Sequence, residues 1–150
     1  MQAPTSLMAD LGKLIEYNTS CAPGFVQKAG VVAVERGEEI ITHTIARYSK
    51  ARDYLFDQLS SPFFRDAGII APRPKGAMYL FFRIQGEQDS LALCKRLVAD
   101  AGLGLAPGSA FGPEGEGAIC WCFASSLERL TLGVQRLENF LKNHPTARQP

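Results

Sequence analysis

The 150-residue sequence lacks several features that would place it in a functional class at once. No window approaches the run of about 18 apolar residues that a membrane-spanning helix needs. The first helix carries Asp10 and Glu16, unlike the basic start and apolar core of a signal peptide. An excess of one charge is also absent, because 16 Lys and Arg face 15 Asp and Glu. We therefore expect a cytoplasmic protein whose partner is neither a membrane nor a nucleic acid.

Motifs for several common chemistries are missing as well. The Gly-rich stretch 106–117 contains neither Gly-Lys-Ser/Thr nor G-x-G-x-x-G. The sequence pattern places no Ser or Cys next to His43 or His144, so it does not support a hydrolytic triad. Cys120 and Cys122 would share one strand face and could chelate a metal, but no second Cys pair or nearby His accompanies them. We predict four reduced thiols and no metal site.

The sequence does have the composition of a globular domain, with 46% hydrophobic and 21% charged residues. Apolar residues at helical spacing predict helices over about 5–17, 25–36 and 38–60, with Gly37 ending the second helix. From this pattern we expect an N-terminal helical segment over residues 1–36, a domain over 37–143 and a frayed tail over 144–150.

The expected domain alternates helices with short strands. Residues 77–84 are aromatic and nearly continuous, which predicts a central strand covered on both faces. The elements that follow are a helix over about 90–101, strands over 103–106 and 118–124, and a last helix that begins at the capping box Ser125-x-x-Glu128. A helix between the first two strands permits a parallel crossover, and the next pair can be antiparallel. The predicted fold is α/β, a small mixed sheet of about three strands with helices mainly on one face, behind an N-terminal helical pair.

Several stretches resemble the C-terminal part of the class I/II, fold-type I aminotransferases, which use pyridoxal phosphate. Residues 75–81 (KGAMYLF) are similar to the family's strand pattern P-x-G-A-x-Y-x-F, and residues 107–112 (PGSAFG) are close to a family hallmark. Residues 117–124 (GAICWCFA) and a Ser-capped helix follow, and residues 17–27 are similar to the loop after the cofactor-binding domain. Order and spacing agree over nearly the whole chain, so the resemblance implies the fold of the small domain.

The resemblance also implies which residues lie at the site. They are Gly76 and Ala77 for substrate binding and, on active-site loops, Asn18, Thr19, Ser20, Gly108 and Ser109. The family pattern G-x-h-R-h-x-h-A has an Arg that grips the substrate carboxylate with two hydrogen bonds, and Cys120 stands at that position here. A thiol cannot replace a planar guanidinium, so we expect poor binding of amino acids.

A second departure from the family concerns the cofactor. The family's Schiff-base lysine lies in a Ser-x-x-Lys segment, on a large domain that would precede this sequence, and none of the six lysines has that context. The resemblance therefore implies the substrate-side domain of an enzyme that transfers an amino group between an amino acid and a 2-oxo acid. We expect no catalytic residue, no bound pyridoxal phosphate and no activity in this chain alone. Its expected partners are the missing cofactor-binding domain and, through an exposed apolar face, further copies of itself.

Two alternatives stay open. The strand and helix order from Ala77 resembles half of a ferredoxin-like sandwich, which hosts many non-catalytic ligand-binding and protein-interaction modules. The chain could also dock onto a separately made cofactor domain and complete an enzyme. The preferred amino acid of such an enzyme does not follow from the sequence.

Overall fold

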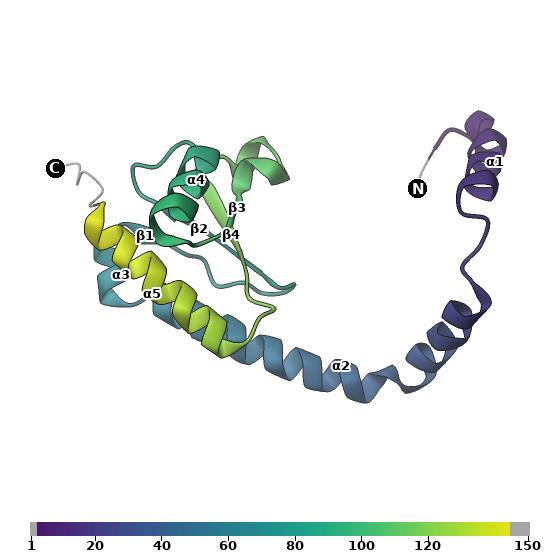
Figure 1. The fold of residues 1–150 in the computed structure, drawn as a ribbon, viewed down its shortest axis with the longest axis horizontal. Coiled ribbons are helices and arrows are strands. Elements are labelled where there is room, and N and C mark those ends of the chain that lie inside the picture. The colour runs from purple at the N-terminus through teal and green to yellow at the C-terminus, as the bar shows by residue number, and fades with distance from the viewer. Residues whose placement is uncertain (1–2, 145–150) are drawn as a thin grey trace. The chain divides into compact units, whose positions relative to one another are not determined.

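The computed structural model describes residues 3–144, and the chain divides into two compact units, Met1–His43 and Thr44–Pro150. The first unit contains a 3-10 turn η1 (Thr5–Leu7), helix α1 (Met8–Asn18) and the first part of helix α2 (Gly24–Leu59) (Figure 1). None of its described side chains is buried. No helix within residues 3–144 combines the length and the apolar character needed to cross a membrane.

Helix α2 differs from the expectation of two helices. It runs without a break through Gly37, so the predicted helix end at that residue is wrong. The backbone of Gly37 does not adopt the left-handed conformation that ends a helix. A glycine inside a helix costs only about 1 kcal/mol relative to alanine, and the helix continues at that cost. The expected boundaries of the domain, at residues 37 and 143, stay predictions.

The second unit is an antiparallel sheet with helices on one face. Besides the last part of α2, its elements are α3 (Pro62–Asp66), β1 (Ile69–Ile70), β2 (Tyr79–Ile84), α4 (Ser90–Ala101), β3 (Ala106–Pro107), η2 (Gly108–Phe111), η3 (Pro113–Gly115), β4 (Ala118–Cys122) and α5 (Leu127–Asn143). The strand order is β1-β2-β4-β3, and every neighbouring pair is antiparallel.

This architecture confirms the α/β fold with helices on one face, but the sheet has four strands instead of about three and no parallel neighbours. Strands β2 and β3 do run in the same direction, as a crossover through α4 requires. Strand β4 lies between β2 and β3, so these two parallel strands are not neighbours. The sequence predicts a mixed sheet, but every pair of neighbouring strands is antiparallel. The added strand, β1, has only two residues, Ile69 and Ile70, which is too short for a periodic signal.

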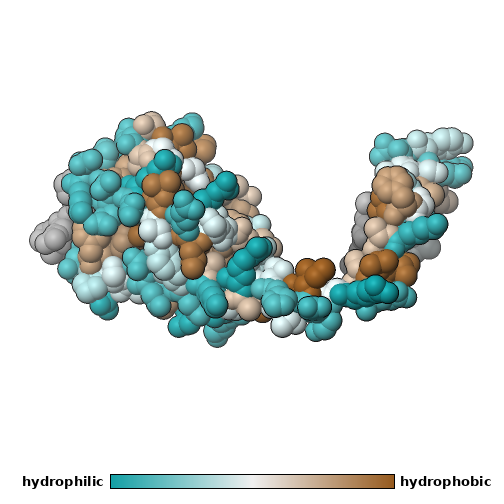
Figure 2. Space-filling view, turned by 60° about the horizontal axis from the view of Figure 1, so that its bottom comes forward, coloured by the Kyte–Doolittle hydropathy of each residue, from teal (hydrophilic) through white to brown (hydrophobic). Residues whose placement is uncertain are grey.

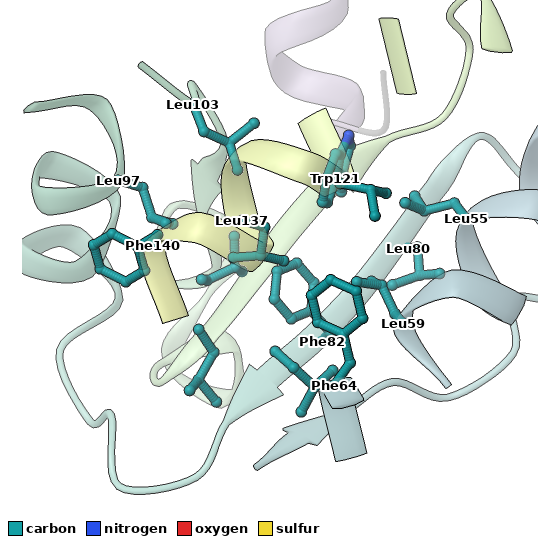
Figure 3. Close-up of a cluster of buried hydrophobic side chains, with 14 of the residues drawn as sticks. Leu55, Leu59, Phe64, Leu80, Phe82, Leu97, Leu103, Trp121, Leu137 and Phe140 are labelled. Atoms are coloured by element: carbon teal, nitrogen blue, oxygen red, sulfur yellow. The ribbon is translucent and has the colours of Figure 1, made fainter. Parts of the chain in front are cut away.

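The core lies between the inner face of the sheet and the helices. The cross-strand pairs Leu80–Trp121 and Phe82–Ile119 place four buried side chains on that face. Leu55 of α2 lies close to Leu80 in the same cluster (Figure 3). Strand β2 is central, as expected, but its buried residues alternate with the exposed Tyr79 and Arg83 and the half-buried Phe81, so its outer face is covered only in part. Aromatic side chains of β2 point to both faces of the sheet, so the sequence does not show an alternation between apolar and polar residues.

The ends of the later helices test two capping predictions. Asp89 caps α4 by accepting a hydrogen bond from the Ala92 N–H at 2.8 Å, and Gly102 ends it with φ 62°, both as expected. Helix α5 is capped by Ser126, which accepts from the Arg129 N–H at 3.3 Å. The capping box at Ser125 is therefore wrong by one residue.

A frayed tail is expected over residues 144–150. Residues 145–150 of that prediction lie outside the described residues. His144, the last described residue, stacks on Phe140 with ring centroids 4.5 Å apart.

Several large apolar side chains are exposed at the surface of the described residues (Figure 2).

Candidate functional site

The candidate site is the outer face of the sheet around Cys120. The register pairs Phe81 with Cys120 and Tyr79 with Cys122, so these four side chains share one face. Trp121 points the other way into the core, which confirms the predicted orientation of the two cysteines. Cys120 is 4% exposed, whereas Cys122 is exposed.

Cys120 lines a hollow of about 330 Å³ on this face. The lining residues carry no charge: Tyr79, Gly104, Leu105, Ala106, Phe111, Cys120, Trp121 and Cys122. Burial raises the pKa of the Cys120 thiol, and the neighbouring Cys122 raises it further, so the thiol stays neutral at pH 7. The hollow can therefore hold an apolar group, but it offers no cation to a carboxylate.

The Gly-rich loop that contains η2 and η3 covers part of the same face. The Phe111 ring meets the Phe81 ring edge to face, with centroids 5.3 Å apart. Gly108 lies so close to Gly115 that a Cβ on Gly108 would overlap the Gly115 carbonyl oxygen and lie 2.7 Å from that of Ala118. Glycine is needed there for a close backbone approach, which an ordinary connecting loop does not require.

Polar contacts hold this loop in place. Arg83 of β2 donates to the carbonyl oxygens of Glu116 at 2.5 Å and Glu114 at 3.1 Å. The Ser90 N–H donates to the Glu116 carboxylate at 2.8 Å, and the hydroxyls of Ser90 and Ser109 are 3.0 Å apart. The Ser90 N–H, together with the Gly117 N–H, lowers the pKa of Glu116. Because Arg83 donates to two carbonyl oxygens of the loop, its guanidinium is already occupied by contacts within the chain.

The other residues that the sequence singled out lie in different places. Gly108 and Ser109 are in η2, which also contains Phe111, a residue that lines the Cys120 hollow. Gly76 and Ala77 line a separate hollow of about 230 Å³ next to α2. Residues 18–20 (Asn18, Thr19 and Ser20) follow α1 in the first unit. The second unit therefore brings Cys120 and the Gly-rich loop together, without Gly76 or Ala77.

Sequence reasoning missed the residues that build the loop and the hollow. Tyr79 could have been found from alternation along β2, since it is two residues before Phe81. Arg83, Ser90 and Glu116 gave no signal, because their contacts join residues 26 to 33 positions apart in the chain.

The lysines test whether this chain could hold pyridoxal phosphate through a Schiff base. All six are exposed: Lys13, Lys28, Lys50, Lys75, Lys95 and Lys142. None of them lines the Cys120 hollow. The Cys120 hollow therefore offers no amine for a Schiff base, whereas Lys75 lines the smaller hollow next to α2.

Comparisons with known proteins identify the relatives. No known family model matches the chain. It is 35% identical over 148 residues to a probable N-acetyl-LL-diaminopimelate aminotransferase of Bacillus subtilis, a match that covers 98% of this chain and 36% of the relative. It is 31% identical over 133 residues to an aspartate aminotransferase of Thermotoga maritima, covering 89% of this chain and 32% of that protein.

A comparison with solved structures also finds aminotransferases. The crystal structure of an aromatic aminotransferase from Pyrococcus horikoshii matches with a TM-score of 0.79 at 29% identity, covering 94% of this chain and 37% of that one. The chain thus spans about a third of the length of the relatives it matches. Because sequence and fold agree, the chain belongs to the pyridoxal-phosphate-dependent aminotransferases, as a segment with the fold of their small C-terminal domain.

Proposed function

We propose that these 150 residues serve as the substrate side of an aminotransferase site and catalyse no amino transfer by themselves. The relatives are named for amino transfer from N-acetyl-LL-diaminopimelate and from aspartate, which supports transfer between an amino acid and a 2-oxo acid as the reaction of a complete enzyme of this kind. The observation that carries the proposal is the uncharged hollow around Cys120. The resemblance implies that Cys120, on the outer face of β4, stands at the position of the family's carboxylate-binding Arg.

The replacement of that Arg has a physical consequence. A guanidinium forms paired, charge-assisted hydrogen bonds with a carboxylate, and a neutral thiol forms only weak ones. The nearest arginine on the sheet, Arg83, already donates to two loop carbonyls. The proposal is therefore that amino acids and 2-oxo acids bind this hollow poorly.

The proposal extends to the cofactor, the partners and the location. The family uses pyridoxal phosphate, and any cofactor chemistry would depend on a cofactor-binding domain outside these 150 residues. Exposed apolar residues, among them Ile70 and Phe111, favour contact with such a domain or with a second copy. All four cysteines are free thiols, which suits the reducing cytoplasm.

The test is a site-resolved binding measurement on the full chain. We expect 2-oxoglutarate to leave the ¹H–¹⁵N signals of Tyr79, Cys120 and Cys122 unshifted in the unmodified protein. Cys120→Arg should raise the affinity about tenfold, the effect of one charge-assisted hydrogen bond, with shifts at the same residues. Cys122→Arg is the matched control, because it adds the same charge on the same face of β4 at another position.

Two results would overturn the proposal. One is clear binding of 2-oxoglutarate at Tyr79 and Cys120 in the unmodified chain, which needs no folded variant to be interpreted. The other is formation of a new amino acid by the chain mixed with pyridoxal phosphate, an amino acid and a 2-oxo acid.

The second candidate function is a non-catalytic ligand-binding module. The observation that favours it is an apolar hollow of about 480 Å³ on the outer face, lined in part by Pro72, Phe81 and Ala118. Binding of a neutral apolar probe there, with no response to 2-oxoglutarate in Cys120→Arg, would support this alternative.

A further inference from the structure

A different hollow, between helix α2 and the segment before β2, combines hydrogen-bond donors with apolar walls. It has a volume of about 230 Å³ and belongs wholly to the second unit. Helix α2 and the segment before β2 supply most of its lining, and one residue follows β4: the residues are Ile45, Tyr48, Ser49, Arg52, Lys75, Gly76, Ala77 and Phe123. The site proposed above does not include it, and the inference does not rest on that function.

Three of the lining donors are unused. Within residues 3–144, the Ser49 hydroxyl, the Tyr48 hydroxyl and the Lys75 ammonium group have no hydrogen-bond or ion-pair partner. Each can donate at least one hydrogen bond to an acceptor in the hollow. The three donors come from helix α2 and from the segment before β2, so they approach the hollow from two elements.

The charges around the hollow favour an anion. Asp53 accepts from Arg52 at 2.9 Å and from Arg73 at 2.7 Å. Both contacts lower the pKa of Asp53, the larger effect coming from Arg52, so this carboxylate is ionised at pH 7. Arg52 and Lys75 line the hollow, and together with Arg73 they outnumber the Asp53 carboxylate by two positive charges. Only the Nε and Nη2 atoms of Arg52 contact Asp53, so Nη1 remains available.

The backbone at one wall is strained. Ala77 has φ 57°, in the left-handed region that a residue with a Cβ rarely adopts. Such strain is concentrated at ligand sites, where the surrounding structure holds it. Ala77 lines the hollow together with Lys75, two residues before β2 begins.

We propose that this hollow binds the phosphate group of a small phosphomonoester. A phosphate presents three oxygens and nearly two negative charges, which match the three unused donors and the two uncompensated positive charges. A carboxylate offers two oxygens and one charge. Ile45 and Phe123 form apolar walls beside the donors, and the volume limits the organic part to about the size of one ring.

The test is calorimetric titration of the full chain at low chloride concentration with phenyl phosphate, inorganic phosphate and benzoate. We expect phenyl phosphate to bind more tightly than benzoate, with ¹H–¹⁵N shifts at Ser49 and Ala77. Lys75→Ala and Ser49→Ala should each weaken binding, Lys75→Ala by about tenfold, because a charge-assisted hydrogen bond is lost. Lys50→Ala is the matched control, since Lys50 is exposed on α2 but does not line the hollow.

Three results would overturn the proposal. Benzoate could bind as tightly as phenyl phosphate, which would make the site a carboxylate site. Lys50→Ala could weaken binding as much as Lys75→Ala, which would indicate a diffuse surface field. The shifts could also fall at Tyr79 and Cys120 instead, which would move the anion to the other hollow without deciding the function proposed for it.

Discussion

The two units of the chain contain similar amphipathic helices but differ completely in burial. In the first unit no described side chain is buried, and Leu14 and Phe25 are 65% and 77% exposed. In the second unit, helices and sheet enclose one continuous core that includes Leu55 and Phe82, at 0% and 1% exposure. Periodicity alone therefore gives helices, whereas burial of the apolar stripe gives a stable unit.

Helix α2 shows the same contrast within one element. Its apolar stripe continues from Ile41 through Ile45 to Leu55 and Leu59. The first two side chains are 51% and 59% exposed, and the last two are fully buried. The sequence pattern is uniform along the helix, so only the sheet and α5 of the second unit account for the difference.

The largest predicted effect separates the two units directly. Phe82→Ala should destabilise the second unit by about 3–5 kcal/mol, because it removes a buried ring and leaves a cavity. Phe25→Ala, which removes the same side chain from an exposed position, should change stability by less than about 0.5 kcal/mol. Urea unfolding followed by circular dichroism measures both, and equal losses would contradict the comparison.

The second prediction concerns the Gly-rich loop of the second unit. Gly108→Ala should destabilise it by about 1–3 kcal/mol, because the new Cβ would overlap the Gly115 carbonyl and force the backbone to shift. Gly104→Ala is the control, since no atom lies within 4 Å of its Cβ position. Thermal unfolding should place Gly104→Ala at or slightly above the unmodified protein. A neutral Gly108→Ala would show that the loop is loosely packed.

The third prediction is a pH dependence confined to the second unit. Hydrogen bonds in the folded state lower the pKa of Glu116 from its ordinary value of 4.5. Its contribution is therefore present above pH 4.5 and is lost as the pH falls through the lowered folded-state value. Glu116→Gln should make the unfolding midpoint less sensitive to acid in this range. If the unfolding midpoint of Glu116→Gln fell with pH as steeply as that of the unmodified protein, Glu116 would not be a source of the pH dependence.

The smallest predicted effect compares two strained residues, one in each unit. Ala77 and Ser20 both have positive φ, 57° and 58°. Ala77→Gly should stabilise the second unit by about 0.5–1 kcal/mol, because glycine adopts this conformation without a steric cost. Ser20→Gly should leave cooperative unfolding unchanged, since its unit adds no buried side chain. Differential scanning calorimetry compares the two variants, and a gain in Ser20→Gly would contradict the account.

Much of the second unit could be predicted from the sequence because local signals decide it. Asp89 and Gly102 delimit α4, and alternation places Cys120 opposite Trp121. The antiparallel pairing of β3 with β4 agrees with the sequence-based expectation. The two-residue strand β1 and the pairing of β2 with β4 could not be predicted, because strand pairing is set by contacts between distant residues. The same reason hides the Arg83 and Glu116 contacts that hold the loop over the candidate site.

Hydrogen–deuterium exchange of the full chain at low concentration tests the central claim most directly. The account predicts strong protection of amides in β2, β4 and α5, and exchange close to that of an unfolded peptide for residues 8–18, whose helix buries no side chain. Protection of residues 8–18 equal to that of β4 would contradict the claim that the stability of this chain resides in its second unit.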